Sequence, residues 1–94
     1  MIPKIEKIEE VIATRNLVYI SDSGQREQAA VEIGKPFRLA NETFICPYRV
    51  ASSSYEKLFG IVGIVELQAL SLTLKTIESE LIYWKRKKGG SFEF

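Results

Sequence analysis

The sequence predicts an α+β fold: a four-stranded antiparallel sheet, arranged as a meander, packed in two layers on one long C-terminal helix. Near the end of the chain, apolar residues recur at intervals of three and four, which traces one face of a helix. They are Leu67, Leu70, Leu74, Ile77, Leu81 and Trp84. Upstream lie short segments rich in β-branched and aromatic residues, separated by turn residues. A helix and a sheet that each have one apolar face can bury those faces against each other.

Length and composition indicate one globular domain. The chain has 94 residues, of which 46% are hydrophobic and 27% charged, and its formal net charge is +1. A chain of this size holds a single core. We assign residues 11–94 to the domain and residues 1–10 to an N-terminal tail or short helix. The three isoleucines Ile2, Ile5 and Ile8 suggest helical spacing there, but so short a helix is marginal in isolation.

The first two strands are expected to form a hairpin. Val11 to Ile20 is the first strand, and Ser21 to Gly24 supplies the Asp and Gly that a tight reversal needs. Glu27 to Ile33 alternates between apolar and polar residues and is the second strand. The break Gly34-Lys35-Pro36 then opens a loop that reaches Asn41. Within this loop, the side chains of Phe37 and Leu39 are expected to point inward.

The third and fourth strands are expected over Thr43 to Val50 and Tyr55 to Val62. Alternation along the third strand places Cys46 on the face that also carries Phe44, Tyr48 and Val50, and Arg49 on the opposite face. Pro47 has no backbone N–H, so we expect the third strand at an edge of the sheet or with a bulge at this residue.

The helix is expected to begin between Ile64 and Glu66 and to run to about Lys87. Glu66 in the first turn and the basic residues of the last turn match the signs that the helix dipole favours. Gly89-Gly90 ends it. The two aromatic residues of Ser91 to Phe94 predict a tail that packs back on the domain.

The residue types present disfavour most kinds of catalysis. There is no histidine, so the usual general base and the Ser–His and Cys–His pairs are missing. The single cysteine, Cys46, cannot form an internal disulfide or a thiolate metal site, and its apolar neighbours indicate a core residue. The sequence has neither a phosphate-binding loop nor a dinucleotide fingerprint. We therefore expect no enzyme activity, no cofactor and no metal.

Two surfaces are candidates for binding. Arg15, Tyr19 and Arg49 are expected on exposed strand faces, where they could contact a protein partner. Lys85, Arg86, Lys87 and Lys88 follow two aromatic residues, a pattern that could grip phosphates while a ring stacks on a base. The alternative interpretation is structural: Trp84 belongs to the buried stripe, and the cations complement the helix C-terminus. The three–four spacing of the stripe also allows a homodimer through paired helices.

The N-terminus indicates neither export nor membrane anchoring. Acidic residues interrupt residues 1–10, and no uncharged stretch approaches the roughly twenty residues that span a bilayer. A cytoplasmic location is the expectation.

Four short motifs, in this order, resemble a family of small uncharacterised bacterial domains. They are Ile12-Ala13-Thr14-Arg15-Asn16-Leu17, Ile33-Gly34-Lys35-Pro36, Cys46-Pro47-Tyr48-Arg49 and the helical Gln68-Ala69-Leu70, followed by Gly89-Gly90-Ser91-Phe92. The likeness covers roughly residues 12–94. Relatives tend to have Asp two residues after Gly63, as a helix N-cap, where this chain has Val65. The resemblance implies a bacterial origin and the fold described above, and it supplies no activity.

The leading functional expectation is a non-catalytic protein-binding module, of the kind that immunity proteins and antitoxins represent. It would act through the free sheet face or an edge strand, on a protein partner or on a second copy of itself. The alternative is nucleic-acid binding through the basic end of the helix. No membrane partner is expected.

Overall fold

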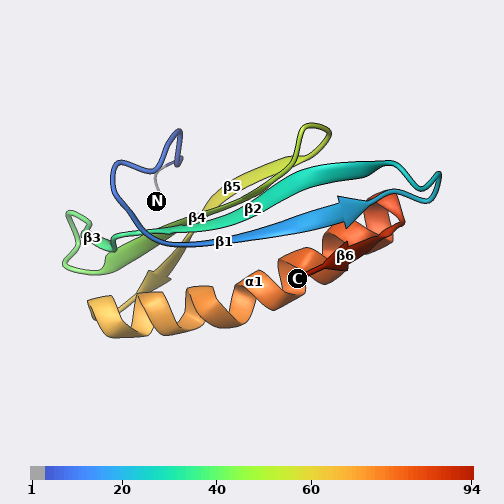
Figure 1. Ribbon diagram of the computed structural model, residues 1–94. Helices are drawn as coiled ribbons and strands as arrows, with labels where there is room; N and C mark the ends of the chain where they lie inside the picture. The colour runs from blue at the N-terminus through green and yellow to red at the C-terminus, as the bar shows by residue number, and fades with distance from the viewer. Residues whose placement is uncertain (1–3) are drawn as a thin grey trace.

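The computed structural model describes residues 4–94 and confirms the α+β class (Figure 1). The strands expected from the sequence are β1 (Val11–Ile20), β2 (Arg26–Gly34), β4 (Phe44–Ala51) and β5 (Glu56–Gly63), and the helix is α1 (Glu66–Lys88). Two short strands come in addition: β3 (Phe37–Arg38) and β6 (Ser91–Glu93). The described sheet therefore has six strands rather than four.

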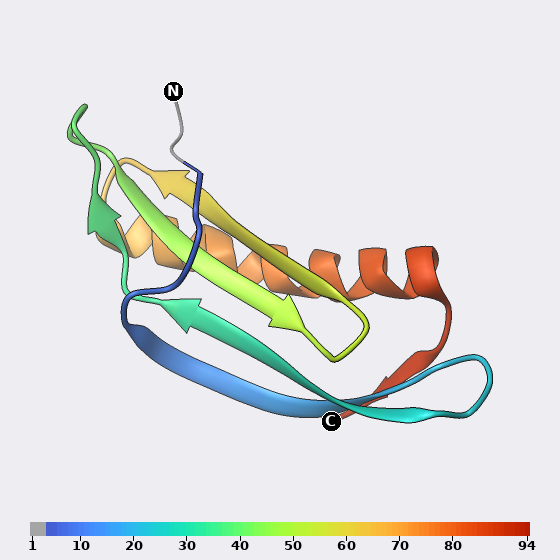
Figure 2. The same ribbon diagram turned by 90° about the horizontal axis from the view of Figure 1, so that it is seen from above.

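The four long strands form an antiparallel meander in the order β1-β2-β4-β5. β3 pairs with the start of β4, and β6 pairs with the end of β1. α1 covers one face of the sheet and packs mainly on β4 and β5. The N-terminal segment, residues 4–10, crosses the opposite face, as the view from above shows (Figure 2).

The expectation that Pro47 marks an edge or a bulge is wrong, because β4 lies inside the sheet. Pro47 pairs with Gly60 of β5 without a register shift. On its other side, β4 pairs with β2 from Tyr48 onward and with β3 only up to Ile45. Pro47 thus lies in the interval where one neighbouring strand has ended and the next has not begun, so the missing N–H interrupts neither ladder there.

The helix packs on the sheet with a different face from the one that the apolar stripe predicts. Its buried residues are Ala69, Thr73, Glu80 and Trp84. Leu67 and Leu74 are exposed, and the other three aliphatic stripe residues are only half-buried: Leu70, Ile77 and Leu81. At 3.6 residues per turn, the buried face is rotated by about a quarter of a turn from the stripe.

Small and polar residues on α1 explain this rotation. Ala69 allows the helix backbone to approach the sheet, and the Thr73 hydroxyl donates to the Ala69 carbonyl (2.8 Å), which satisfies it inside the core. Glu80 accepts a hydrogen bond from the buried Tyr48 hydroxyl, and the Nζ of Lys57 lies 3.2 Å from its carboxylate. A buried carboxylate needs such partners, so they hold this face of the helix against the sheet.

An aromatic cluster joins the C-terminal end of α1 to the sheet. The fully buried Trp84 ring stacks on Tyr55 (centroids 4.5 Å apart) and contacts Phe92 (4.9 Å) and Tyr19 (5.1 Å). Phe92 comes from β6, which confirms that the tail packs back on the domain. Edge-to-face and offset aromatic pairs add to the burial of apolar area.

The two ends of α1 are held by short contacts. Val65 provides no side-chain cap; instead the Gln68 side-chain oxygen accepts the Ile64 N–H (2.6 Å) just before the helix. At the other end Gly89 adopts φ 73° and its N–H donates to the Lys85 carbonyl (2.7 Å), as expected for a glycine that ends a helix. The next N–H, from Gly90, donates to the Asp22 carboxylate in the β1–β2 turn (2.9 Å).

On the outer face, Ile5 and Ile8 of the N-terminal segment are half-buried. A Cβ added to Gly60 would lie 3.1 Å from Ile5, and one added to Gly34 would lie 2.6 Å from Ile8. Residues 4–10 form neither helix nor strand, and the predicted contribution of Ile2 lies outside the described residues. The expectation that Phe37 turns inward is wrong: its side chain is exposed, whereas Leu39 is half-buried.

We predict that Gly63→Ala strongly destabilises the fold. A Cβ at Gly63 would lie 2.5 Å from the Ala69 backbone nitrogen and 2.9 Å from its Cα, and backbone cannot move aside as a side-chain tip can. The expected loss in the free energy of unfolding is about 2–3 kcal/mol, measured by urea denaturation. Gly24→Ala is the control: no atom lies within 4 Å there, so only the strain of φ 86° is added, at about 1 kcal/mol. Equal losses in both variants would contradict the close approach of α1.

We predict that Tyr48→Phe weakens the alkaline dependence of stability. Burial, followed by the hydrogen bond to Glu80, raises the pKa of Tyr48 above its ordinary 10.0. Because the pKa is raised in the folded state, protonated Tyr48 contributes its full share of the free energy of unfolding below pH 10. That share is lost as the pH rises further, since the tyrosine of the unfolded chain ionises first. Urea unfolding between pH 8 and pH 11, on the wild type and the variant, measures the slope. The variant is also less stable at pH 8, because Glu80 loses a donor. Parallel curves would show that Tyr48 titrates as it does in the unfolded chain.

Candidate protein-binding surface

The N-terminal half of β1 is an open strand edge. β1 pairs with β2 along its length, but on its other side β6 pairs only with Val18 to Ile20. No strand of residues 4–94 pairs with that side of Val11 to Leu17. The first six residues of β1 are exposed, whichever face their side chains point to. This stretch therefore offers a row of backbone donors and acceptors to a partner.

The opposite edge of the sheet is better covered. β5 is also paired on one side only, but α1 packs against it, and Ile5 lies over its central glycine, Gly60. Lys57 of β5 is engaged with Glu80 on the helix. Of these two strands, the first half of β1 is the more exposed: Val11 to Asn16 are all exposed, whereas most residues of β5 are half-buried or buried.

The exposed leucines of α1 lie on the flank of the helix that faces β1. Ile77 and Leu81 pack against the core cluster that contains Leu17 and Val31, so this flank is turned toward β1 and β2. Glu80 and Tyr83, on the other flank, approach Lys57 of β5. Leu67 and Leu74 continue the β1-side flank outward and remain 74% and 57% exposed. We call Leu67, Leu70 and Leu74 the leucine flank.

The C-terminal residue lies between these two features. Phe94 is 74% exposed, and the Arg15 guanidinium lies 5.0 Å from its ring centroid. The ring thus covers part of the inner face of β1, where α1 does not reach. The open edge of β1, the Phe94 ring and the leucine flank together form one surface. It has backbone hydrogen-bonding groups along one border and apolar side chains beside them. Such a surface is suited to binding an extended strand together with apolar side chains.

Of the three protein-binding residues proposed from the sequence, only Arg15 lies on this surface. Tyr19 is 2% exposed, so the expectation of an exposed side chain is wrong: its ring packs on Trp84, and its hydroxyl donates to the Gly89 carbonyl (2.8 Å). Burial also raises the pKa of this tyrosine. Arg49 lies on the outer face, far from α1, and is half-buried.

Arg49 is already engaged within the sheet. Its Nε donates to Glu56 (2.6 Å) and its Nη1 to Glu32 (3.3 Å), each on a neighbouring strand. The hydrogen bond to Glu56 raises the pKa of Arg49 above its ordinary value. A partner would have to compete with both carboxylates, so Arg49 holds β2, β4 and β5 together across the outer face.

The basic residues Lys85, Arg86, Lys87 and Lys88 are all exposed at the end of α1. Trp84 is fully buried and cannot stack on a base. Its neighbour Tyr83 is 46% exposed, and its ring has the Nζ of Lys57 at 5.3 Å and that of Lys87 at 5.9 Å. The exposed aromatic ring of this patch is therefore Tyr83.

Sequence reasoning assigned the leucine flank first to the core and kept pairing with a second helix as the alternative. The core was favoured because leucine is a common core residue. A signal was present in Ala69, Thr73 and Glu80, which share another face. A small residue, a hydroxyl and a carboxylate on one helix face do not predict that this face is buried, because burial of the polar groups is favourable only when they have hydrogen-bonding partners.

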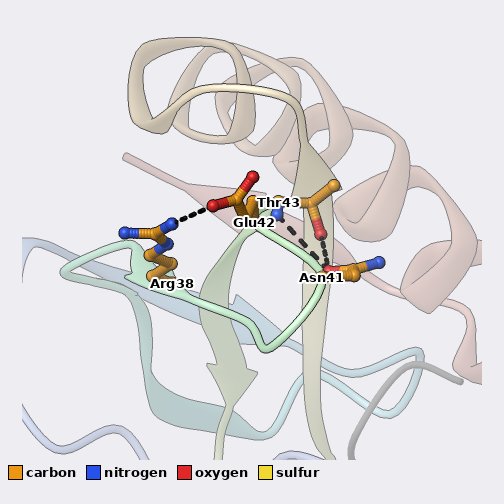
Figure 3. A network of polar contacts seen from close by, with 4 residues as sticks. All are labelled: Arg38, Asn41, Glu42 and Thr43. Carbon is orange, nitrogen blue, oxygen red and sulfur yellow. Dashed lines mark hydrogen bonds and ion pairs between the residues drawn. The ribbon is translucent and has the colours of Figure 1, made fainter.

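Cys46 and the β3–β4 turn are two further polar features among residues 4–94. Cys46 is fully buried with its Sγ 3.4 Å from the Gly34 carbonyl oxygen, and burial raises the pKa of its thiol. In the β3–β4 turn, Arg38 binds Glu42 (2.7 Å) and the Thr43 hydroxyl donates to Asn41 (2.6 Å), which stabilises a turn with Glu42 at φ 66° (Figure 3).

A hollow of about 630 Å³ lies on the outer face. Its walls are the N-terminal segment on one side and Lys35, Pro36, Phe37 and Pro47 on the other. Three lysines and three glutamates line it, so it has no net charge. Within residues 4–94 no group of three potential metal ligands occurs, and none of the helical segments described is both long and apolar enough to cross a bilayer.

Comparison with known proteins supplies a family. No curated protein and no solved structure matches the chain significantly. A family model described as "Domain of unknown function (DUF6968)" matches residues 13–94, which includes all of α1 and all but the first two residues of β1. The chain therefore belongs to the DUF6968 family of domains of unknown function.

Proposed function

We propose that this protein is a non-catalytic protein-binding module whose binding surface is the open edge of β1 together with the leucine flank. The single observation that supports this most is the coincidence of the two features: an unpaired strand edge lies on the same side of the molecule as Leu67 and Leu74, which α1 leaves exposed. Each feature alone is common on monomeric proteins. An open strand edge together with exposed apolar side chains beside it fits a protein–protein interface.

The edge is only partly protected. Natural sheets protect exposed edges with prolines, bulges or inward-pointing charges. Along Val11 to Leu17 there is no proline, but the register with β2 shifts once, between Val11 and Ala13, and Arg15, on the inner face, is held over Phe94. Val11 and Ile12 are exposed apolar residues at this edge. A partner strand would pair with backbone groups and cover these side chains.

The kind of module follows from size and resemblance. The likeness to small bacterial domains leads us to propose a bacterial, cytoplasmic protein of the immunity or antitoxin kind, which binds one protein partner tightly and turns over no small molecule. A compact body of two layers with one open edge is sufficient for such a role, since strand addition requires no pocket.

We predict that Leu67→Glu/Leu74→Glu abolishes capture of the specific partner. Both side chains are exposed, so the fold is expected to tolerate the change within about 0.5 kcal/mol, while a charge in an apolar interface is costly. Tagged wild type and variant are incubated with nuclease-treated lysate of the source organism, and bound proteins are compared by mass spectrometry. Leu72→Glu is the matched control, because Leu72 is also exposed on α1 but points away from the flank. Equal recovery with all three proteins would refute the proposed surface.

A second candidate function is nucleic-acid binding at the end of α1. The supporting observation is the exposed Tyr83 ring with two lysine Nζ groups beside it and Arg86 and Lys88 nearby. A ring that can stack on a base, surrounded by cations that can bind phosphates, is the minimal arrangement for single-stranded nucleic acid. Because the net charge is only +1, the protein as a whole would not attract nucleic acid, so binding would depend on the charges of this patch alone.

We predict that, if this second function holds, affinity for single-stranded nucleic acid falls steeply with salt and depends on Tyr83. Filter binding between about 50 and 200 mM salt should show a large loss for the wild type. Lys87→Glu/Lys88→Glu should abolish binding, and Tyr83→Ala should weaken it by about 1–3 kcal/mol. Lys75→Glu, on the same helix outside the patch, is the control for net charge. Binding that is insensitive to salt and to these residues would exclude the second function.

A further inference from the structure

We propose that the outer face of the sheet carries a second binding site: an apolar groove for an extended peptide segment, which the chain's own N-terminal segment occupies until a partner displaces it. The groove, which we call the glycine groove, is formed by Gly34, Ile45, Pro47 and Gly60. These residues lie within the part of the chain that matches the family, whereas residues 4–10 precede it. The inference goes beyond the proposed function, because this face lies opposite α1 (Figure 2).

Two glycines leave room for two isoleucine side chains. A Cβ on Gly60 would lie 3.1 Å from the Ile5 side chain, and a Cβ on Gly34 would lie 2.6 Å from that of Ile8. Pro47 separates the two glycines: it pairs with Gly60, and its ring would lie 2.7 Å from the Cβ on Gly34. The groove therefore fits an extended segment with two aliphatic side chains three residues apart.

Ile45 shows that the groove is apolar and covered. Alternation along β4 places Ile45 on the same face as Pro47, whereas Tyr48 points to Glu80 of α1 on the other face. Ile45 is nevertheless fully buried. Its side chain and that of Ile5 both lie close to the Cβ position of Gly60, so Ile5 packs beside it. An aliphatic side chain from a partner would gain the same burial in place of Ile5.

The N-terminal segment has few polar contacts with the sheet. Among the hydrogen bonds of residues 4–94, the one that ties residues 4–10 to the sheet runs from the Lys35 N–H to the Glu10 carbonyl (2.9 Å), at the end of the segment. The ion pair of Lys7 with Glu9 (3.9 Å) lies within the segment itself. Segments with few buried contacts and few backbone hydrogen bonds open locally at low cost. Residues 4–9 can therefore leave the groove while the sheet stays folded.

The N-terminal segment also leaves space beside it. The hollow of about 630 Å³ lies between this segment and a wall that contains Pro36, Phe37 and Pro47. Phe37 is 43% exposed. The volume is in the range of pockets that bind ligands. A partner segment that places a further apolar side chain in the hollow would cover the exposed part of Phe37, and this added contact would favour it over the N-terminal segment.

The test uses the full-length chain and a fluorescent peptide with the sequence of residues 1–10. Ile5→Asp/Ile8→Asp, the release variant, should free the groove, because carboxylates are unfavourable in an apolar site. We expect the peptide to bind this variant at least about tenfold more tightly than the wild type, where the tethered segment competes at an effective concentration of roughly 1 mM. Fluorescence polarisation measures both affinities. Lys7→Asp changes the net charge by the same amount at an exposed position of the segment, so it should behave as the wild type.

A second peptide, with aspartate in place of both isoleucines, should not bind the release variant. The inference is overturned if the release variant, shown to be folded by circular dichroism, does not bind the first peptide up to about 1 mM. It is equally overturned if both peptides bind alike, or if the wild type binds as tightly as the variant. Should the release variant fail to fold, Ile5→Ala/Ile8→Ala takes its place under the same criteria, since it empties both holes without adding charge.

Discussion

The structure depends on how its single helix is rotated about its own axis. One helix must cover a sheet of four long strands, and it does so with the face that holds Ala69, Thr73, Glu80 and Trp84. At one end, Ala69 and Gly63 bring the backbones together. At the other, Trp84 is enclosed by aromatic rings from β1, β6 and the β4–β5 turn. Between them Glu80 is held by Tyr48 and Lys57. A carboxylate that is buried in this way stabilises only one orientation, because a rotated helix would leave it without partners.

This orientation has a consequence at the opposite edge of the sheet. Since α1 packs mainly on β4 and β5, the first half of β1 receives no cover, and the leucines on the β1 side of the helix are left half-buried or exposed. The same packing that completes the core thus creates the candidate binding surface. β6 pairs with the end of β1 from Val18 onward, and Phe94, which follows β6, lies against Arg15 within the remaining stretch. The proposed partner strand would complete the sheet where the chain itself does not.

The three residues first proposed for protein binding illustrate what alternation along a strand can and cannot predict. Alternation assigns Arg15 and Tyr19 to one face of β1, which is correct. Their exposure differs because β6 and the end of α1 enclose Tyr19, whereas Arg15 stays exposed and contacts Phe94. Arg49 was placed on the face opposite Cys46, also correctly, but Glu32 and Glu56 on the adjacent strands occupy it. Register between strands decides such pairings, and alternation within a strand carries no information about register.

The sequence by itself determined the local structure: the strand segments, the turn at Asp22 and Gly24, the helix up to Gly89 and the return of the aromatic tail. These features depend on residues close together in the chain, through alternation, backbone freedom and capping. It did not reveal β3, the interior position of β4 or the rotation of α1. Those were decided by tertiary contacts between distant residues, such as Tyr48 with Glu80 and Gly63 with Ala69, in which a small or polar residue is favoured in the core only because of its partner. The open edge and the leucine flank follow from that packing, so only the tertiary structure could show them.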